Sequence, residues 1–588
     1  MFSYILLFLS SILFTSPKLE SKTKKYFYSI IFTSSVFAYT LLGQFSLILI
    51  SLGYSRFPIL FLSFILFLLT ILIDKKIKHK FIYLKESFKS EIIILRNNFN
   101  NNSNKNILLI LLLLILLITI SSVGPINHPD SIDYHIGYPY QYWLRGKFFI
   151  DDGLHQPLLG IGDYANLSFI QEQSIWFIRY LQIITLPVIT LFLIKKTKVG
   201  IYSMVLLSSP VFIQWSTIGK PLFLGESALA ISYLIWKENQ DKFSRNLLII
   251  CIFSCISIKI SSLIILFPIL IDIIFSSFKK LKDSNLWDFL TNEFQSIFSN
   301  KLVIIEFLIL CSIFISRQII IGNFLFPLLT NIFNKNDILI NQFSNLLSSY
   351  KRDNFFPINL FIPLKLNDIS HSIGPSFLIV IIIKIISIIK NKKITNTIFL
   401  TSLVQILLLF LFCQGRGDYY IGPIIIFLYS LKDIKFKNVL SPLKNLLFST
   451  LFLQIILISI FIGFSIKQTI LTLHDYEKTM SLTSFGFSTK KYIDTNLKGN
   501  LFYNIGRDAR FYYPKNYITR DSMDKCLLNN DQNYCLENLE IYQIISLENY
   551  VKNKKDFICT QTREVKGSRI PFNRKELNAE ICRRKLPK

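Results

Sequence analysis

Acidic residues are scarce in this sequence, which has 37 Asp and Glu against 64 Lys and Arg and a formal net charge of +27. Such a basic balance can indicate a nucleic-acid-binding protein. Here, however, the lysines and arginines gather in short stretches between long apolar runs. That distribution is typical of loops on the cytoplasmic side of a membrane. We therefore expect no nucleic-acid partner.

A cleavable signal sequence is also missing. The first apolar run has no charged region before it and no small-residue cleavage site after it, so we expect it to be retained as a helix. The chain has 588 residues, of which 51% are hydrophobic, and many apolar runs approach the length that crosses a bilayer. These features exclude an ordinary soluble globule and predict a polytopic membrane protein.

The alternation of apolar runs and basic loops predicts about fourteen transmembrane helices, with both the N-terminus and the C-terminal tail outside. The run 246–276 is too long for one helix and carries Lys259 in its middle, so it predicts two short helices that meet near the outer side. Residues 75–105 are expected to form a basic cytoplasmic loop. The apolar runs are 2–15, 26–52, 56–73, 106–123, 172–194, 199–217, 221–236, 246–276, 301–317, 376–390, 394–413, 420–433 and 447–466.

This pattern divides the chain into three parts. Residues 1–105 are N-terminal helices with the basic loop, and residues 106–466 form the main membrane domain. The membrane domain has two long external loops, 124–171 and 318–375, the second with a predicted surface helix. Residues 467–588 mix strand-like and helix-like stretches, which predicts a small α/β domain outside the membrane. The predicted fold is an all-α polytopic membrane bundle with a small extracytoplasmic α/β domain.

Zinc-ligand spacing is absent from the four cysteines of the tail, since no two of them lie two to four residues apart. An even number of cysteines there predicts two disulfides and an oxidising compartment, in agreement with an external tail. Three pairings are open, and Cys526–Cys535 with Cys559–Cys582 is the simplest.

The loop 124–171 carries most of the chemistry that the sequence predicts. Three of the six histidines lie there, together with five aspartates, Asp130, Asp133, Asp151, Asp152 and Asp163. Asp130 and Asp133 directly follow an apolar run, and their spacing puts both carboxylates on one face of a helix near the headgroups. Asp130 could also simply cap that helix. The helix is expected to lie in the membrane interface, with its tyrosines and Trp143 at headgroup depth and its end at Gly146.

Cationic residues at the outer ends of later helices complete a predicted two-part site. They are Lys220, Lys259, Arg317 and Arg416. A carboxylate that takes a proton and cations that hold a phosphate are the groups needed for glycosyl transfer from a lipid-linked phosphosugar. In the tail, Arg507, Asp508 and Arg510 are interpreted as surface charges.

Four motifs resemble, in the same order, those of GT-C type membrane glycosyltransferases, such as protein O-mannosyltransferases and lipid A aminoarabinose transferases. They are "NHPDSIDYH" with "YPYQYWLRGKFF", then "SIKISSLIILFP", "RQIIIGNFLFPLL" and "QGRGDYYIGP". The resemblance covers about residues 106–430 and departs from the family at Ser131, where an acid is common, and at Phe324, where a proline is common.

This resemblance implies inverting transfer from a polyprenyl-phosphate sugar to a cell-surface glycan or glycolipid, at the outer face of the bacterial inner membrane. Asp130 becomes the expected base, with Asp133 as second choice. The residues expected to bind the lipid phosphate or sugar are His135, Lys220, Lys259, Arg317, Arg416 and Tyr419.

Several alternatives remain open at this point. No cofactor is implied for certain, but Asp130, Asp133 and His135 could together bind a divalent cation, Mg²⁺ or Mn²⁺. A lipid-linked sugar flippase or transporter would favour internal repeats and charges deep within several helices, neither of which the sequence has. A polysaccharide polymerase or ligase would place its main arginine-bearing loop late in the chain. The expected partners are the donor, the acceptor and membrane lipids.

Overall fold

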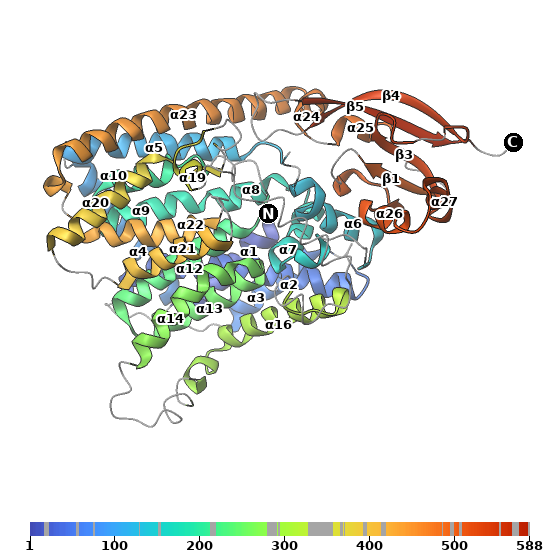
Figure 1. Cartoon of the computed structure of the whole chain (residues 1–588). Coiled ribbons are helices and arrows are strands. Elements are labelled where there is room, and N and C mark those ends of the chain that lie inside the picture. The colour runs from blue at the N-terminus through green and yellow to red at the C-terminus, as the bar shows by residue number, and fades with distance from the viewer. Residues whose placement is uncertain are drawn as a thin grey trace.

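In the computed structural model, a bundle of helices forms most of the chain, and a five-stranded sheet lies at one end of it (Figure 1). The N-terminus lies among the helices, and the sheet belongs to the C-terminal part of the chain. The structure describes residues 1–16, 23–54, 58–73, 77–100, 102–126, 128, 130–150, 155–211, 219–278, 291, 294–326, 357–364, 369, 371–391, 397–412, 419–434, 436–484, 486–493, 499–504, 509–551, 554–566 and 575–585.

The bundle helices largely follow the apolar runs of the sequence. Their bounds are α1 (Phe2–Thr15), α2 (Phe27–Ser51), α3 (Ile59–Ile73), α4 (Ile77–Asn100), α5 (Asn102–Ser122), α6 (Gly137–Arg145), α7 (Ile161–Gln171), α8 (Trp176–Ile183), α9 (Thr185–Thr197), α10 (Gly200–Leu207), α12 (Leu222–Asn239), α13 (Lys242–Ile258), α14 (Leu263–Phe278), α16 (Lys301–Ile321), α19 (Ile358–Phe361), α20 (Pro375–Asn391), α21 (Thr397–Phe412), α22 (Ile421–Tyr429) and α23 (Ser441–His474).

Among the described residues, 5 helical stretches are long and apolar enough to cross a membrane, by length and composition. Four shorter apolar helices accompany them, including α1 and α3. The long stretches are Phe27–Ser51, Lys105–Ser122, Trp176–Thr197, Lys301–Ile321 and Ser441–His474. The helical membrane character predicted from the apolar runs is therefore supported.

The predicted break between two helices at Lys259 is confirmed. Helix α13 ends at Ile258, Lys259 has an extended backbone (φ −156°, ψ 119°), and α14 begins at Leu263 after a short 3-10 turn. A charged side chain in the middle of an apolar run is costly unless the helix ends there, and the chain breaks at that point.

The single helix expected over 172–194 is present as one helical stretch, Trp176–Thr197, with an irregularity at Ile184. The chain forms α8 and α9, with Ile184 between them. Pro187 lies in the first turn of α9 and has no N–H to donate to the carbonyl of Ile183, so a continuous helix would lose that hydrogen bond.

Helix α4 replaces the predicted basic loop over 75–105. Its buried face carries Tyr83, Ser87 and Glu91, which are spaced by four residues and so lie on one side of a helix. Tyr28 donates a hydrogen bond of 2.7 Å to Glu91, and Lys195 pairs with the same carboxylate. This lysine-rich segment is therefore an amphipathic helix that packs against α5 and α1, and its Glu91 is bonded to residues of α2 and α9.

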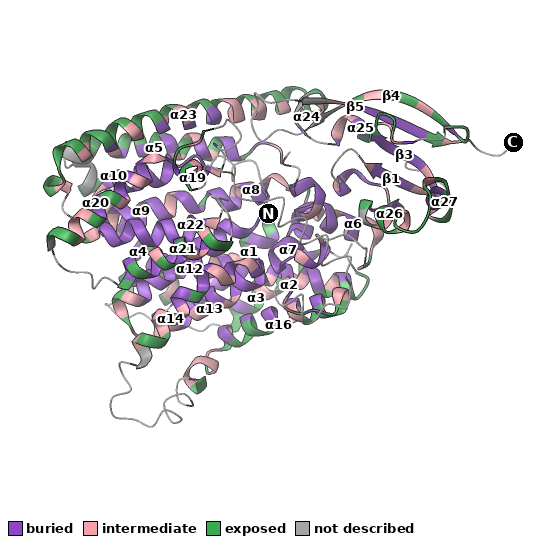
Figure 2. Ribbon diagram, in the orientation of Figure 1, coloured by how far each residue is buried: buried purple, intermediate pink, exposed green. Residues whose placement is uncertain are grey.

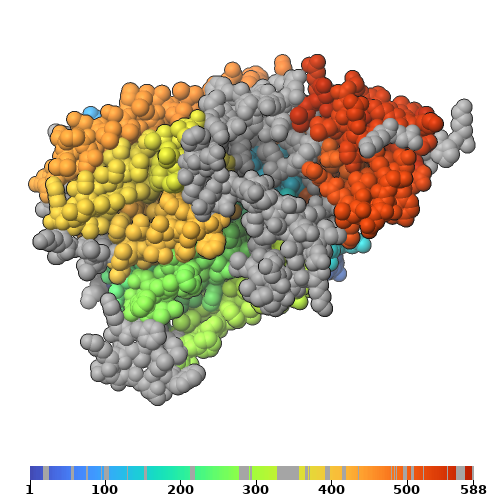
Figure 3. All heavy atoms as spheres, in the orientation of Figure 1, coloured from blue at the N-terminus to red at the C-terminus, as the bar shows by residue number. Residues whose placement is uncertain are grey.

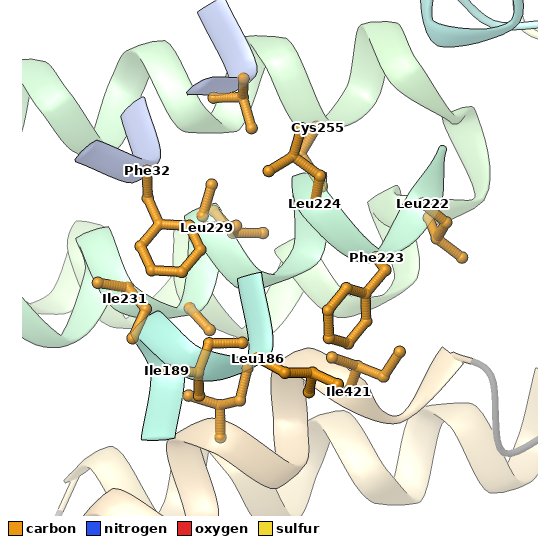
Figure 4. Close-up of a cluster of buried hydrophobic side chains, with 14 of the residues drawn as sticks. Phe32, Leu186, Ile189, Leu222, Phe223, Leu224, Leu229, Ile231, Cys255 and Ile421 are labelled. Carbon is orange, nitrogen blue, oxygen red and sulfur yellow. The ribbon is translucent and has the colours of Figure 1, made fainter. Parts of the chain in front are cut away.

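The interior of the bundle is built around α12, whose residues from Leu222 to Trp236 are all buried. Figure 4 shows Phe32 of α2, Leu186 of α9, Phe223 of α12 and Ile421 of α22 packed together. A helix that is apolar on every side belongs in the core of a bundle.

The outer helices present apolar side chains instead of burying them. Exposed residues colour much of α23 green in Figure 2, and Phe452 and Leu453 of that helix are 64% and 65% exposed. Apolar surface of this extent on several helices is what lipid chains would cover.

The C-terminal domain is a small α/β fold, as predicted. Its sheet has the order β2-β1-β3-β5-β4, in which β1 is parallel to β2 and β3, and β5 is antiparallel to β3 and β4. The strands are β1 (Asn500–Asn504), β2 (Tyr517–Ile518), β3 (Ile541–Leu547), β4 (Phe557–Lys566) and β5 (Lys575–Arg584); the helices are α24 (Tyr476–Thr483), α25 (Phe487–Lys490), α26 (Arg520–Leu527) and α27 (Gln532–Asn538).

Two disulfides cross-link this domain, and they have the simplest of the three pairings left open by the sequence. The S–S distance is 2.14 Å for Cys526–Cys535 and 2.07 Å for Cys559–Cys582, which links the neighbouring strands β4 and β5. Figure 3 shows the domain in red at one end of the bundle. Helix α23 leads into it and runs to His474, past the expected boundary at residue 466.

Candidate active site

The loop 124–171 folds back on the bundle as a chain of short helical turns. A π-helical turn over Ser131–His135 leads into α6, and Gly146 ends α6 with a left-handed backbone (φ 80°). A 3-10 turn over Gln156–Leu158 then precedes α7. Residues 151–154, which include Asp151 and Asp152, lie outside the described part of the loop.

Helix α6 was expected in the membrane interface with its tyrosines at headgroup depth, but two of these tyrosines are buried inside the protein. Tyr138 and Tyr142 are fully buried, and Gln141 donates hydrogen bonds to the backbone carbonyls of Arg510 (2.8 Å) and Tyr513 (3.0 Å). The helix is therefore held between the bundle and the C-terminal domain. Its tyrosines pack there because both partners present apolar and aromatic side chains, which the local sequence does not reveal.

Asp130 and Asp133 are both buried, at 6% and 1% exposure. Asp130 stands at the N-cap position, just before the π-helical turn, and its side chain makes no capping hydrogen bond to that turn. The capping interpretation of Asp130 is thus not supported. The neighbouring Ser131 accepts a hydrogen bond of 2.9 Å from the N–H of Gly219, which brings the residue before Lys220 against this turn.

Asp133 is engaged by the C-terminal domain. Arg510 donates to one carboxylate oxygen, and His155 Nδ1 lies 3.6 Å from the other. The guanidinium of Arg510 also lies over the ring of Tyr138, 4.6 Å from its centroid. Arg510 was interpreted as a surface charge, and that prediction is wrong because the tail packs directly on the loop.

His135 forms a buried pair with Asp163. The distance from His135 Nδ1 to Asp163 Oδ1 is 2.6 Å, and Asp163 Oδ2 accepts a 2.8 Å hydrogen bond from the N–H of Gly160. Asn166 donates to the carbonyl of His135 (2.6 Å). Within the described chain, His135 Nε2 is buried without a hydrogen-bond partner. Asp163 therefore fixes the orientation of the ring through Nδ1.

The charges of this pair follow from its surroundings. Burial lowers the pKa of His135, and Asp163 opposes that shift. Burial alone would raise the pKa of Asp163, but His135, Lys259 and the N–H of Gly160 together hold it below its usual value. Asp163 is thus an ionised carboxylate beside an imidazole whose charged form is disfavoured by burial. No sequence motif singled out Asp163 as the partner of His135.

Lys259 and Arg317 converge on one short stretch of the loop. Lys259 Nζ donates to the carbonyl of Leu158 (3.3 Å). Arg317 Nε and Nη2 donate to the carbonyls of Pro157 and Leu159, both at 3.2 Å. Both cations are buried, and Arg317 Nη1 has no hydrogen-bond partner among the residues that the structure describes. Two helices that are distant in the sequence, α13 and α16, therefore hold the same turn.

Lys220 completes a group of three buried cations. Its Nζ lies 4.5 Å from the centroid of the Tyr419 ring. Lys220 and Arg317 repel the ammonium group of Lys259, whereas Asp163 attracts it. Asp130 also acts on Lys259 electrostatically. An anion bound among these cations would relieve their mutual repulsion.

Five of the expected substrate-binding residues thus have described positions, whereas Arg416 lies outside the described residues. A metal site needs several ligand atoms close together. Among the described residues, the side chains of Cys559, Glu580 and Cys582 have ligand atoms within 4.8 Å of one another. Its two cysteines form a disulfide. The combination of Asp130, Asp133 and His135 remains a prediction.

The chain was also compared with known proteins. No protein-family model matches it, and no curated protein sequence matches it either.

Proposed function

We propose that this protein is a GT-C type glycosyltransferase. It transfers a sugar from a polyprenyl-phosphate donor to a cell-surface glycan or glycolipid acceptor, with inversion at the anomeric carbon. The proposal combines the motif resemblance in residues 106–430 with the chemistry of the groups that converge around the loop 124–171.

The observation that carries the proposal is the convergence of opposite charges in a buried place. Asp130 comes from the start of the loop, and Lys220, Lys259 and Arg317 come from three later parts of the chain. Buried ionisable groups are expensive in a membrane protein and mark functional cavities or pathways. A carboxylate with several cations matches the needs of a reaction that moves one proton and releases one phosphate.

Each group has a role in this mechanism. The acceptor hydroxyl attacks the anomeric carbon from the face opposite the phosphate, and the bond from that carbon to the phosphate oxygen breaks. The electron pair of this bond leaves with the phosphate, whose added negative charge Lys259, Arg317 and Lys220 stabilise. The hydroxyl proton passes to Asp130 as general base. No other reactant is required.

Asp130 is preferred over Asp133 as the base because Asp133 is already engaged. Arg510 and His155 hold the carboxylate of Asp133, so its role is to position the loop against the C-terminal domain. A carboxylate paired with a guanidinium is a weaker base, since the pair stabilises its ionised form.

The topology proposed with this function has about fourteen membrane crossings and an active site that faces the outside of the bacterial inner membrane. The two disulfides in the C-terminal domain support this orientation, because disulfides persist in oxidising compartments. The domain lies on the same side as the loop that it contacts through Arg510.

The proposal is tested with the substitution Asp130→Asn in membranes that contain the full chain. Incorporation of radiolabelled sugar from a polyprenyl-phosphate donor into extracted glycan or glycolipid should fall by about 10²- to 10⁴-fold, since a general base contributes that much. The amount of protein, measured by immunoblot, should stay the same.

The matched control is Asp556→Asn, which changes an exposed carboxylate of the C-terminal domain and should leave transfer unchanged. Full activity in Asp130→Asn and also in Asp133→Asn would remove the catalytic assignment. Donor movement across vesicles without sugar transfer would instead indicate a flippase, and chain elongation of a glycan would indicate a polymerase or ligase.

A further inference from the structure

A cavity lies away from the candidate active site. It has a volume of about 1040 Å³ and is lined by residues of α1, α2, α3, α13 and α16, which lie side by side in Figure 1. Arg317, in the active site, is twelve residues beyond Ile305 of the cavity wall (317 − 305), or about 18 Å along α16. The two sites therefore occupy different ends of this helix.

The lining of the cavity is mainly apolar. Its side chains include Phe14, Phe37, Leu41, Phe45 and Leu66. Phe14 and Ile305, which both line the cavity, are 43% and 37% exposed. An apolar cavity that opens between lipid-facing helices suits a hydrocarbon chain.

Two polar groups are buried in this lining without a protein partner. Within the described residues, Ser11 Oγ and Asn246 Oδ1 have no hydrogen-bond partner, and both side chains are more than nine-tenths buried. A buried polar group left without a hydrogen bond is costly, so native proteins rarely keep one. Asn246 Oδ1 is a hydrogen-bond acceptor, so the amide has to turn over, which exchanges its oxygen and nitrogen, before its N–H can donate to a ligand carbonyl. These groups point to a polar atom of a ligand.

The rim of the cavity is suited to a negative charge. It is formed by Ser299, Asn300 and the exposed Lys301 at the N-terminus of α16. Asn300 caps this 21-residue helix by accepting a 2.9 Å hydrogen bond from the N–H of Leu302. The N-terminal end of a helix carries partial positive charge, to which the lysine adds.

We propose that this cavity binds one glycerophospholipid. One acyl chain lies along the phenylalanine and leucine side chains, and an ester carbonyl accepts hydrogen bonds from Ser11 and Asn246. The phosphate contacts Lys301 at the rim. A polyprenyl phosphate has a hydrocarbon chain and a phosphate but no ester carbonyl, so it would leave both buried polar groups unsatisfied. The proposal is independent of the proposed glycosyl transfer.

The ester contact is tested by comparing a diacyl phosphatidylglycerol with its dialkyl ether analogue. Each lipid is titrated into the delipidated full-length protein in detergent, and the lipid-bound fraction is measured by native mass spectrometry. The wild type should bind the ester lipid about tenfold more tightly, as expected for one or two hydrogen bonds. The double variant Ser11→Ala/Asn246→Leu should bind the two lipids equally. Equal binding by the wild type would overturn the proposal.

The location is tested by filling the cavity. Leu41→Trp should abolish retention of phospholipid during purification, whereas Leu308→Trp, at an exposed position of α16 outside the lining, should leave it unchanged. Retention in Leu41→Trp equal to that of the wild type would contradict the assigned site, as would extraction of polyprenyl phosphate in place of phospholipid. The thermal transition of each variant shows whether it is folded. Asp130→Asn should keep its phospholipid, which separates this test from that of the catalytic proposal.

Discussion

Replacing Arg510 by methionine is expected to destabilise the packing of the C-terminal domain on the bundle by about 3 kcal/mol, the lower end of the range for breaking a buried ion pair. The side chains of Arg510 and Asp133 are 1% and 2% exposed, so the substitution leaves a carboxylate where water does not reach. His155 Nδ1, 3.6 Å from the other carboxylate oxygen, offsets part of the cost when it is protonated. Methionine keeps most of the buried volume, which limits any contribution from a cavity.

A double-mutant cycle isolates the charge from the shape. Asp133→Asn removes the negative charge, so Asp133→Asn/Arg510→Met should be more stable than Arg510→Met alone, by about 2 kcal/mol. The assay is the thermal unfolding midpoint of the purified protein in detergent at a fixed scan rate. Limited proteolysis of the C-terminal domain reports its release from the bundle.

The control is Arg520→Met, which removes an exposed ion pair with Asp524 whose side chains are 50% and 57% exposed. Exposed pairs of this kind contribute about 0.5 kcal/mol or less. Equal unfolding midpoints for Arg510→Met and Arg520→Met would refute the reasoning. Strict additivity in the double-mutant cycle would refute it as well, because it would show that the two charges do not interact.

Three further predictions follow from the site. Gly160→Ala should prevent stable folding, since its Cβ would lie 1.8 Å from the backbone oxygen of Ile258, whereas Gly463→Ala, with nothing within 4 Å, should be tolerated; expression yield and melting temperature test both. Lys259→Met should lower kcat/KM for sugar transfer, because the variant lacks one of the cations proposed to stabilise the leaving phosphate, while the amount of protein measured by immunoblot stays the same. Transfer should resist EDTA, because Asp133, a candidate metal ligand, is already engaged by Arg510 and His155. A loss of transfer in EDTA that Mg²⁺ restores would contradict this prediction.

Local patterns predicted the parts of the fold that local physics decides. A lysine inside an apolar run is enough to predict the break at Lys259, and the end of α6 at Gly146 follows from the left-handed backbone that glycine adopts readily. Mixed periodicity likewise predicted the α/β tail. Helix α4 was missed because its lysines resemble those of a loop. Its buried Glu91 is held by Tyr28 and Lys195, which are distant in the sequence.

The candidate site was only partly predictable, because its key contacts join distant segments. Arg510 meets Asp133 across 377 residues, and no spacing rule connects them. The pairing of His135 with Asp163 spans 28 residues and depends on how α7 folds back on the loop. Residue type and predicted side of the membrane were enough to choose Lys259 and Arg317, but not to show that both hold one turn of the loop.

That shared turn bears on how the cations could serve catalysis. Lys259 uses one of three N–H donors on the carbonyl of Leu158, and Arg317 uses two of five on the neighbouring carbonyls, while its Nη1 faces no partner among the described residues. The spare donors can bind a phosphate without releasing the turn. The bonds to the turn also fix both side chains before substrate arrives, so little rearrangement is needed when charge develops on the leaving phosphate. Holding the loop and stabilising the leaving group are therefore compatible roles, and the same bonds that order the loop would prepare the cations for the reaction.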